Sequence, residues 1–181
     1  MTTQKIFVDN KIVTVTGVGY APEGHFELDG KPIDTAKDET LSFLLKAAAL
    51  CNDARLRRHK LDGKHQWEIY GDTTEGALVV AAAKAGFQKD DLEAKYPRID
   101  EIPFDPKNRY MATFHRISEG KLHVYVKGAP ETVLEMCSEI LEEGKKKKLT
   151  PQRMEEILKV NTQMASEALR VLAIAYELID A

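Results

Sequence analysis

Three consecutive β-type segments near the middle of the chain constrain its fold more than any other feature. Residues 99–104 (IDEIPF), 109–117 (RYMATFHRI) and 121–127 (KLHVYVK) are rich in β-branched and aromatic side chains. Ser118, Glu119 and Gly120 separate the last two segments, and the glycine stands where a hairpin loop needs a left-handed residue. The pattern predicts an antiparallel sheet built around a hairpin.

The hairpin also predicts a pairing register. If Ile117 pairs with Lys121, then Met111 faces Lys127, and Arg109 lies diagonally from Lys127 on the same face of the sheet. The Cβ atoms of such diagonal neighbours are about 7–8 Å apart. Two cations beside the glycine that follows would suit an anionic ligand, although cations on a half-exposed strand are most often only solvated.

Helices and further strands surround these segments. Asp38 and Asp72 are N-cap residues for two of the helices, and Glu75 completes a capping box after Asp72. The polar segment 54–65 is expected to be irregular, and the lysine run 145–148 to be a solvated loop between helices. Apolar periodicity and caps predict helices over residues 38–53, 72–85, 90–96, 130–137 and 151–169, and strands over 5–20, 66–70 and 170–179.

The expected fold is α+β, with a mainly antiparallel twisted sheet flanked by helices, in a single domain over residues 1–181. A net charge of −3 argues against a nucleic-acid partner or an anionic membrane surface. No stretch of the sequence is apolar for long enough to span a bilayer. Cys51 and Cys137 fit no CxxC pattern, which favours a reducing compartment over a disulfide framework.

The sequence lacks the residue patterns of several common site classes. It contains neither a GxxxxGK[ST] phosphate loop nor a GxGxxG dinucleotide motif. His115 and His123 would face each other across the hairpin, but two imidazoles without a third ligand make a poor metal site. From the residues alone, the inference therefore ends at an anion site near Lys127.

Five short motifs follow one another along the chain: ALCND at 49–53, GDTTEGAL at 71–78, FDPKNRYM at 104–111, KGAPE at 127–131 and RVLAIA at 170–175. Together they resemble the nucleotide-binding domain of P-type cation-transporting ATPases, most of all the subgroup that contains the calcium pumps. The resemblance runs from about residue 40 to the end, and the initial MTTQK is similar to the tail of the family's DKTGTLTxN segment. It implies a domain excised from a larger membrane pump.

The resemblance implies a division of labour between domains. In the family, this domain binds ATP and presents its γ-phosphate to the aspartate of DKTGT on a neighbouring domain, which drives cation transport. The DKTGT and TGDGxND segments are absent from this sequence, so the isolated chain is expected to bind ATP without hydrolysing it. Mg²⁺ would act in the full-length enzyme, with no ligands from this domain.

The same resemblance implies a cytoplasmic domain of an integral membrane protein. Its partners would be ATP and the phosphorylation and actuator domains of the same pump, with no nucleic acid and no direct membrane contact. The isolated domain is expected to be a monomer, and calcium as the transported ion rests on the resemblance alone. The alternative is a non-catalytic interaction module whose nucleotide binding is weak or vestigial.

The resemblance also implies roles for individual residues. Phe104 matches the aromatic residue that stacks on adenine, and Glu75 matches the acidic residue near the adenine amino group. Lys127 matches a lysine at the bottom of the pocket, and Arg170 an arginine near the β-phosphate. The complete set of matched ATP-binding residues is Asp72, Thr74, Glu75, Phe104, Arg109, Lys127, Gly128, Ala129, Arg170 and Leu172.

Structural roles are the alternative for several of these residues. Phe104 would then be a core side chain next to Ile102 and Pro103, and Arg170 a solvated strand end. The sequence also departs from the family at two positions. Arg109 stands where lysine is usual, so its contact is expected to differ in geometry, and Pro106 stands where the calcium pumps commonly have arginine, so phosphate contact there is expected to be weaker.

Overall fold

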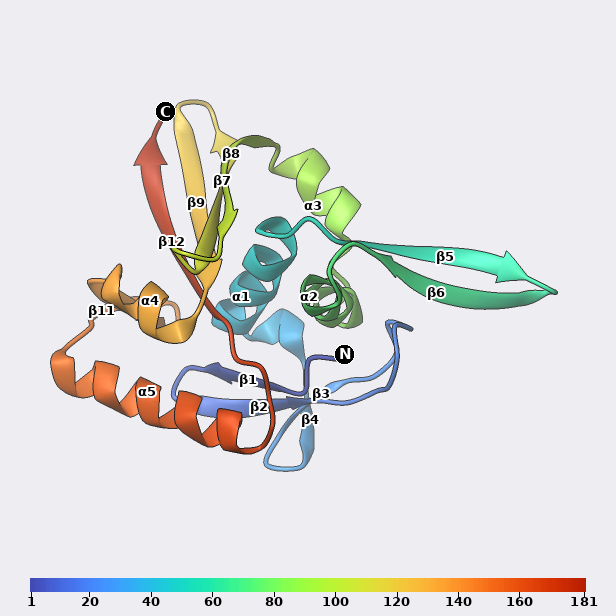
Figure 1. Cartoon of the computed structure of the whole chain (residues 1–181), viewed down its shortest axis with the longest axis horizontal. Coiled ribbons are helices and arrows are strands. Elements are labelled where there is room, and N and C mark those ends of the chain that lie inside the picture. Colours follow the sequence, from blue (N-terminus) through green and yellow to red (C-terminus); the bar gives the residue numbers. More distant parts are fainter. The chain divides into compact units, whose positions relative to one another are not determined.

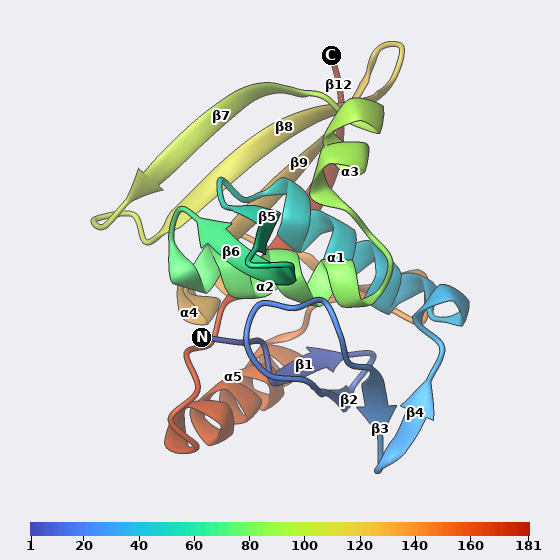
Figure 2. The same ribbon diagram turned by 90° about the vertical axis from the view of Figure 1, so that its right-hand side faces the viewer.

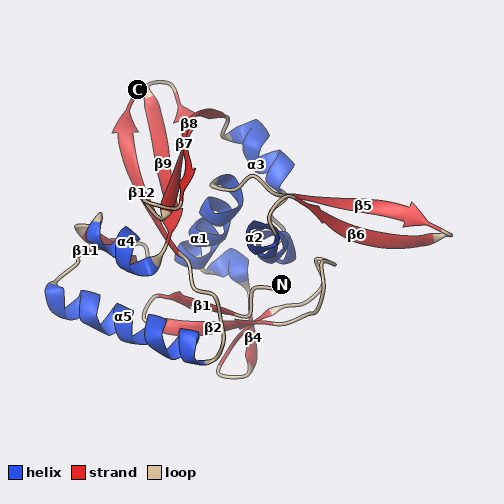
Figure 3. Ribbon diagram, viewed as in Figure 1, coloured by secondary structure: helices blue, strands red, loops and turns tan.

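The computed structural model describes residues 1–181. The chain divides into two compact units, Met1–Ala94 and Lys95–Ala181, and each is described by itself. Both units combine antiparallel sheets with helices, so the predicted α+β class is confirmed (Figures 1 and 3). The expectation that the whole chain forms one nucleotide-binding domain stays a prediction.

The first unit contains a small sheet and a pair of helices. Strands β1 (Lys5–Val8), β2 (Lys11–Val15), β3 (Phe26–Leu28) and β4 (Lys31–Ile33) form a four-stranded antiparallel sheet in that order. The turn η1 (Thr35–Lys37) leads into α1 (Glu39–Leu50), which is followed later by α2 (Thr73–Lys84) and α3 (Lys89–Lys95). The sheet lies against α1 and α2 in both views (Figures 1 and 2).

Helices α1 and α2 supply most of the core of this unit. Both begin at the predicted aspartate caps, since Asp38 accepts from the Leu41 N–H and Asp72 from the Thr74 and Glu75 N–H groups. Runs of buried alanines on both helices leave room for close packing. The larger buried side chains of the two helices are Leu41, Leu45, Leu50, Val79 and Val80.

A long two-stranded hairpin connects α1 to α2. Strands β5 (Arg55–Leu61) and β6 (Lys64–Tyr70) pair along their full length and extend away from the helices (Figure 1). Asp62 and Gly63 both have positive φ, 50° and 77°, as a tight two-residue hairpin turn requires. The expectation of an irregular segment over 54–65 was therefore wrong, because cross-strand pairing gives order that the polar sequence does not indicate.

The second unit is built on the predicted hairpin. Strands β8 (Tyr110–Ser118) and β9 (Lys121–Gly128) are flanked by β7 (Arg98–Asp105) and β12 (Ala173–Asp180), in the order β12-β9-β8-β7. The predicted pairs Met111–Lys127 and His115–His123 are confirmed. The starting pair Ile117–Lys121 was wrong, since a bulge between Arg116 and Ser118 pairs Ser118 with Lys121.

Shorter elements complete the second unit. Helix α4 (Pro130–Glu135) contacts β9, β12 and α5 (Pro151–Ser166). Between the helices, β10 (Glu139–Glu142) pairs with β11 (Lys145–Lys148). The lysine run is therefore a strand, and the predicted loop was wrong because a neighbouring strand provides its hydrogen bonds. No helix of the chain combines the length and apolarity needed to cross a bilayer.

The last helix and strand are shorter than predicted at their junction. Helix α5 ends at Ser166, whereas the periodicity predicted an end near residue 169. Ala168 has a φ of 60°, so the backbone leaves the helix there, and β12 begins only at Ala173. Arg170 and Leu172 consequently lie in the connection and not in a strand.

Candidate functional site

Lys127 lies near the end of β9, where its strand neighbours are Met111 on β8 and Ile174 on β12. The residue is only 5% exposed, although its ammonium carries a charge. A buried lysine must find hydrogen-bond acceptors, so it is more constrained than a solvated surface cation. The reading of Lys127 as an ordinary solvent-facing residue therefore does not fit its burial.

Gly128 follows Lys127 at a point of close backbone approach. A Cβ atom added at Gly128 would lie 2.4 Å from the Arg109 carbonyl oxygen and 2.8 Å from the Tyr110 Cα. Any side chain there would force the two strands apart. The Ala129 N–H donates to the same Arg109 carbonyl at 3.1 Å, which joins the start of α4 to the start of β8.

Arg109 closes the turn between β7 and β8. Its φ of 61° is left-handed, and its N–H donates to the Asp105 carbonyl at 2.8 Å. The residue precedes β8, so strand alternation does not fix the direction of its side chain as the predicted register assumed. Instead the Arg109 guanidinium forms a 2.6 Å ion pair with Glu131 on α4.

The Glu131 carboxyl is the anionic partner in this pair. A hydrogen bond from its own backbone N–H, in the first turn of α4, and then the Arg109 guanidinium lower the pKa of Glu131 below its ordinary value. Both side chains are about half exposed, so the pair is accessible to solvent and to ions. Arg109 and Glu131 therefore form an exchangeable pair at the start of α4.

Phe104 lies near the end of β7 and is 57% exposed. The reading of Phe104 as a core side chain does not fit this exposure. The β7–β8 register shifts between Ile102 and Asp105, so the Pro103–Phe104 step is in an irregular part of the strand. An exposed aromatic ring at such an irregularity is available as a flat apolar surface.

The remaining matched residues of the second unit lie in its last connection. Arg170 is exposed and Leu172 is half-buried, between α5 and β12. The first residue of β12 pairs with Gly128, so this connection leads directly to the strand beside Lys127.

The first unit holds the other matched residues at the N-terminus of α2. Asp72 caps the helix, with its carboxylate accepting from Thr74 at 2.8 Å and from Glu75 at 3.1 Å. Glu75 is half-buried, and its carboxylate accepts from the Asp53 N–H at 3.1 Å. The capping role of Asp72 is confirmed, and the Glu75 carboxylate has a partner outside the helix.

Sequence reasoning missed two buried polar residues next to Glu75. Asn52 is fully buried and donates from its side chain to the Glu75 carbonyl, and Lys89, which is 5% exposed, donates to the Asn52 carbonyl. Asn52 belongs to the motif ALCND, which contributed to the family resemblance but assigned no function to Asn52. Lys89 precedes the predicted third helix, and its charge resembles that of many exposed lysines in the chain, so no sequence signal distinguishes it.

The two hairpin histidines take part in protein contacts. His115 is fully buried, with Nδ1 at 2.9 Å from the Tyr96 carbonyl and Nε2 at 2.9 Å from the Thr113 hydroxyl. Burial, and to a lesser degree the Lys146 ammonium, lower the pKa of His123. No group of three histidine, cysteine or acidic side chains in the chain is arranged to hold a metal ion.

Comparison with known proteins agrees with this arrangement of motifs. The family model described as P-type ATPase, cytoplasmic domain N, matches residues 40–181. The chain is 35% identical over its full length to a calcium-transporting ATPase of Bacillus subtilis, covering 20% of that protein. It is 37% identical over 99% of its length to the cation-transporting ATPase pma1 of Synechocystis, again covering 20% of the relative.

A eukaryotic relative gives a similar result. The chain is 35% identical over 97% of its length to the calcium-transporting ATPase type 2C member 1 of Bos taurus, of which it covers 18%. The chain thus spans about a fifth of the length of the curated relatives it matches. The predicted resemblance is confirmed: the chain belongs to the P-type ATPase family, in which it corresponds to the cytoplasmic domain N.

Proposed function

We propose that this chain binds ATP and, in the full-length pump, presents the γ-phosphate to an aspartate on a neighbouring domain. The observation that carries the proposal is the exposure of Phe104, at 57%, on a sheet that also buries the cation Lys127. A base needs a flat apolar surface, and a triphosphate needs a positive charge. Membership in the P-type ATPase family supports the same activity.

Each matched residue has a distinct chemical role in this proposal. Phe104 stacks on the adenine ring, and the Glu75 carboxylate accepts a hydrogen bond from the adenine amino group. The Lys127 ammonium and the Arg170 guanidinium neutralise phosphate oxygens. Asp72 holds the helix turn that carries Thr74 and Glu75, through the cap described above.

The remaining matched residues have supporting roles in the proposed site. Gly128 and Ala129 provide backbone without a large side chain beside Lys127, and Leu172 provides an apolar surface. Arg109 adds positive charge where it is not neutralised by Glu131. Mg²⁺ neutralises phosphate charge when it accompanies ATP in the full-length enzyme, and we assign it no ligand in this chain.

The proposed partners are the phosphorylation and actuator domains of the same pump, and the isolated chain is proposed to be a monomer. Phosphoryl transfer requires an in-line acceptor, which the DKTGT aspartate of the phosphorylation domain would supply. Cation transport would follow in the whole protein, with calcium proposed as the ion because relatives carry that name.

An NMR titration of the labelled chain with ATP tests the proposal. Phe104→Ala is expected to weaken ATP binding on the order of tenfold, because a stacked base loses its aromatic partner. Lys127→Met, which keeps the apolar stem, is expected to weaken ATP binding by a similar factor through the lost charge. Matched controls are Ile99→Ala, an exposed apolar residue of β7, and Lys121→Ala, an exposed lysine of β9.

The controls should bind ATP as the natural chain does. Repeating the titration with Mg²⁺ shows whether ATP binding needs the metal. Repeating it with GTP shows whether the chain distinguishes adenine from guanine. Absence of ATP-induced shifts at millimolar ATP, or equal binding by both site variants and their controls, would contradict the proposal. The chain would then be better described as an interaction module of the pump with a vestigial nucleotide site.

A further inference from the structure

A buried lysine holds the short segment between α1 and β5. Lys89 is 5% exposed, and its ammonium donates to the carbonyl oxygen of Asn52 and, at 2.7 Å, to that of Ala54. The Glu93 carboxylate forms an ion pair with the same ammonium at 3.8 Å. Asn52 and Ala54 are fully buried, so these two carbonyls depend on a protein donor.

The Asn52 side chain continues the connection toward α2. Its Oδ1 accepts from the Ala54 N–H at 2.8 Å, which closes the segment on itself. Its Nδ2 donates to the Glu75 carbonyl at 2.8 Å and to the Ala48 carbonyl at 3.2 Å. A fully buried amide with acceptor and donors satisfied has one orientation, so it fixes the distance between the segment and Glu75.

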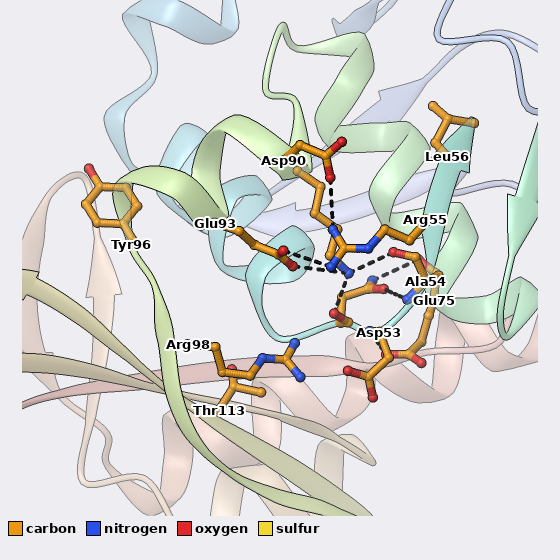
Figure 4. Close-up of polar contacts among 12 residues, drawn as sticks. Asp53, Ala54, Arg55, Leu56, Glu75, Asp90, Glu93, Tyr96, Arg98 and Thr113 are labelled. Carbon is orange, nitrogen blue, oxygen red and sulfur yellow. Dashed lines mark hydrogen bonds and ion pairs between the residues drawn. The ribbon is translucent and has the colours of Figure 1, made fainter. Parts of the chain in front are cut away.

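Glu75 is therefore held at two points. Asn52 binds its main-chain carbonyl, and the Asp53 N–H binds its carboxylate at 3.1 Å. Figure 4 shows Glu75 gathered in one cluster with Asp53, Ala54 and Glu93. The Asp53 N–H orients one oxygen of the Glu75 carboxylate, and because the carboxylate is rigid and planar, the direction of its other oxygen is restricted as well.

We propose that Lys89 and Asn52 are positioning residues for Glu75, and that this positioning sets the preference of the chain for an amino-bearing purine over a keto-bearing one. The inference rests on the proposed ATP binding. An ionised carboxylate can only accept hydrogen bonds, so it favours a ring amino group and disfavours a carbonyl oxygen at the same place. That discrimination needs a carboxylate with a fixed direction, because a mobile one can turn away from the carbonyl.

The Lys89→Met variant of the 181-residue chain separates positioning from simple stability. The dissociation constants of ATP and ITP are compared, since ITP carries a carbonyl where ATP carries the amino group. The ATP preference of the natural chain is expected to fall on the order of tenfold in Lys89→Met, with ITP affinity nearly unchanged. Glu75→Gln sets the reference for a chain without the carboxylate, and Lys89→Met should add nothing further in that background.

A second readout needs no nucleotide. The Asp53 amide donates to the Glu75 carboxylate, so its hydrogen-exchange rate measured by NMR reports on this bond and should be slowed in the natural chain. Lys89→Met should abolish this protection from exchange. Arg55→Met is the matched control, because Arg55 binds Asp90 and Glu93 on α3 but not the carbonyls that Lys89 binds. Asn52→Asp, which keeps the volume but loses the donor to Glu75, replaces Lys89→Met if that variant does not fold.

The outcomes separate the inference from the proposed function. Loss of both the ATP preference and the Asp53 protection, with Arg55→Met unchanged, supports the inference. A folded Lys89→Met or Asn52→Asp chain that keeps the natural preference and protection overturns it while ATP binding stands. A natural chain that binds neither nucleotide overturns the proposed function, and the selectivity inferred here with it.

Discussion

The Arg109 guanidinium lies 2.6 Å from the Glu131 carboxylate, and the two side chains are 53% and 46% exposed. Exposed ion pairs of this kind contribute about 0–1 kcal/mol, because water screens the attraction and ordering long side chains costs entropy. An approaching triphosphate, with several charges, competes well against one carboxylate for the same guanidinium. In the proposed ATP complex, Glu131 would therefore limit how much of the Arg109 charge the phosphates can use.

Removing this competitor should strengthen nucleotide binding. Glu131→Gln is expected to lower the ATP dissociation constant about two- to fivefold at low salt, because it frees Arg109 and removes a negative charge. The advantage should shrink as ionic strength rises. Calorimetry at two salt concentrations measures both effects.

Glu135→Gln provides the control, since it makes the same charge change at an exposed position of the same helix. Equal gains in ATP affinity from both variants would mean that only net charge matters. Weaker ATP binding in Glu131→Gln would instead show that the carboxylate holds Arg109 in a useful position.

At the scale of the element, the hairpin of β8 and β9 was the most predictable part of the fold. Its β-branched and aromatic residues and the glycine of its turn gave the pairs Met111–Lys127 and His115–His123. The bulge at Ile117 was not predictable from the sequence. Pairing Ile117 with Lys121 and pairing Ser118 with Lys121 give the same register over the rest of the hairpin, so the strand pattern does not distinguish them.

Strands made of charged residues were not predictable. β11 consists of four lysines, and five of the seven residues of β5 are arginine, lysine or histidine. Neither has the apolar alternation that identifies a strand, because neither buries a face. Their order comes from backbone hydrogen bonds to β10 and β6, and a single segment carries no information about such a partner.

For the candidate site, the sequence suggested individual residues but not the contacts that surround them. Motif resemblance suggested Glu75, Phe104 and Lys127, whose roles stay predictions; in the structure Phe104 is exposed, Glu75 is half-buried and Lys127 is buried. The contacts of Asn52 and Lys89 were not predictable, because they bind backbone carbonyls, and any residue type supplies a carbonyl. Only the folded chain shows which carbonyls these two side chains reach.

The packing of α2 against β6 depends on Gly76. A Cβ atom at Gly76 would lie 2.5 Å from Cγ2 and 2.9 Å from Cγ1 of Ile69. Gly76→Ala is expected to destabilise the chain by about 1–3 kcal/mol through overpacking, although alanine favours helix by about 1 kcal/mol. Urea unfolding followed by circular dichroism gives the change.

A double-mutant cycle identifies the cause. In the Ile69→Ala background the clashing atoms are gone, so Gly76→Ala should become neutral or stabilising. Additive effects of the two substitutions would show that the cost of Gly76→Ala does not come from the contact with Ile69.

At the scale of the whole chain, two units have separate sets of buried residues. The first is centred on α1 and α2, and the second on its sheet, with Met111, Leu122, Tyr125, Val133 and Met164 buried. The matched residues are divided between the units, with Asp72, Thr74 and Glu75 in the first and the others in the second.

The isolated chain is expected to bind ATP but to release no phosphate from it. The sequence lacks the DKTGT aspartate, and a phosphoryl group without an in-line acceptor has no fast route for transfer. Phosphate release, measured with and without Mg²⁺, should equal that of a buffer blank. Turnover that disappears in Lys127→Met but persists in Lys121→Ala would contradict this expectation, because it would place hydrolysis in the chain itself.

Gly128 has a consequence for how this family can change in evolution. Its missing side chain lets the carbonyl of Arg109 reach the amide of Ala129, so the turn before β8 and the start of α4 share one hydrogen bond. Substitutions in these two segments, which are distant in sequence, should therefore show epistasis. A library that varies residues 105–109 and 129–131 together would recover compensated pairs that single-site libraries discard, provided that Gly128 is kept.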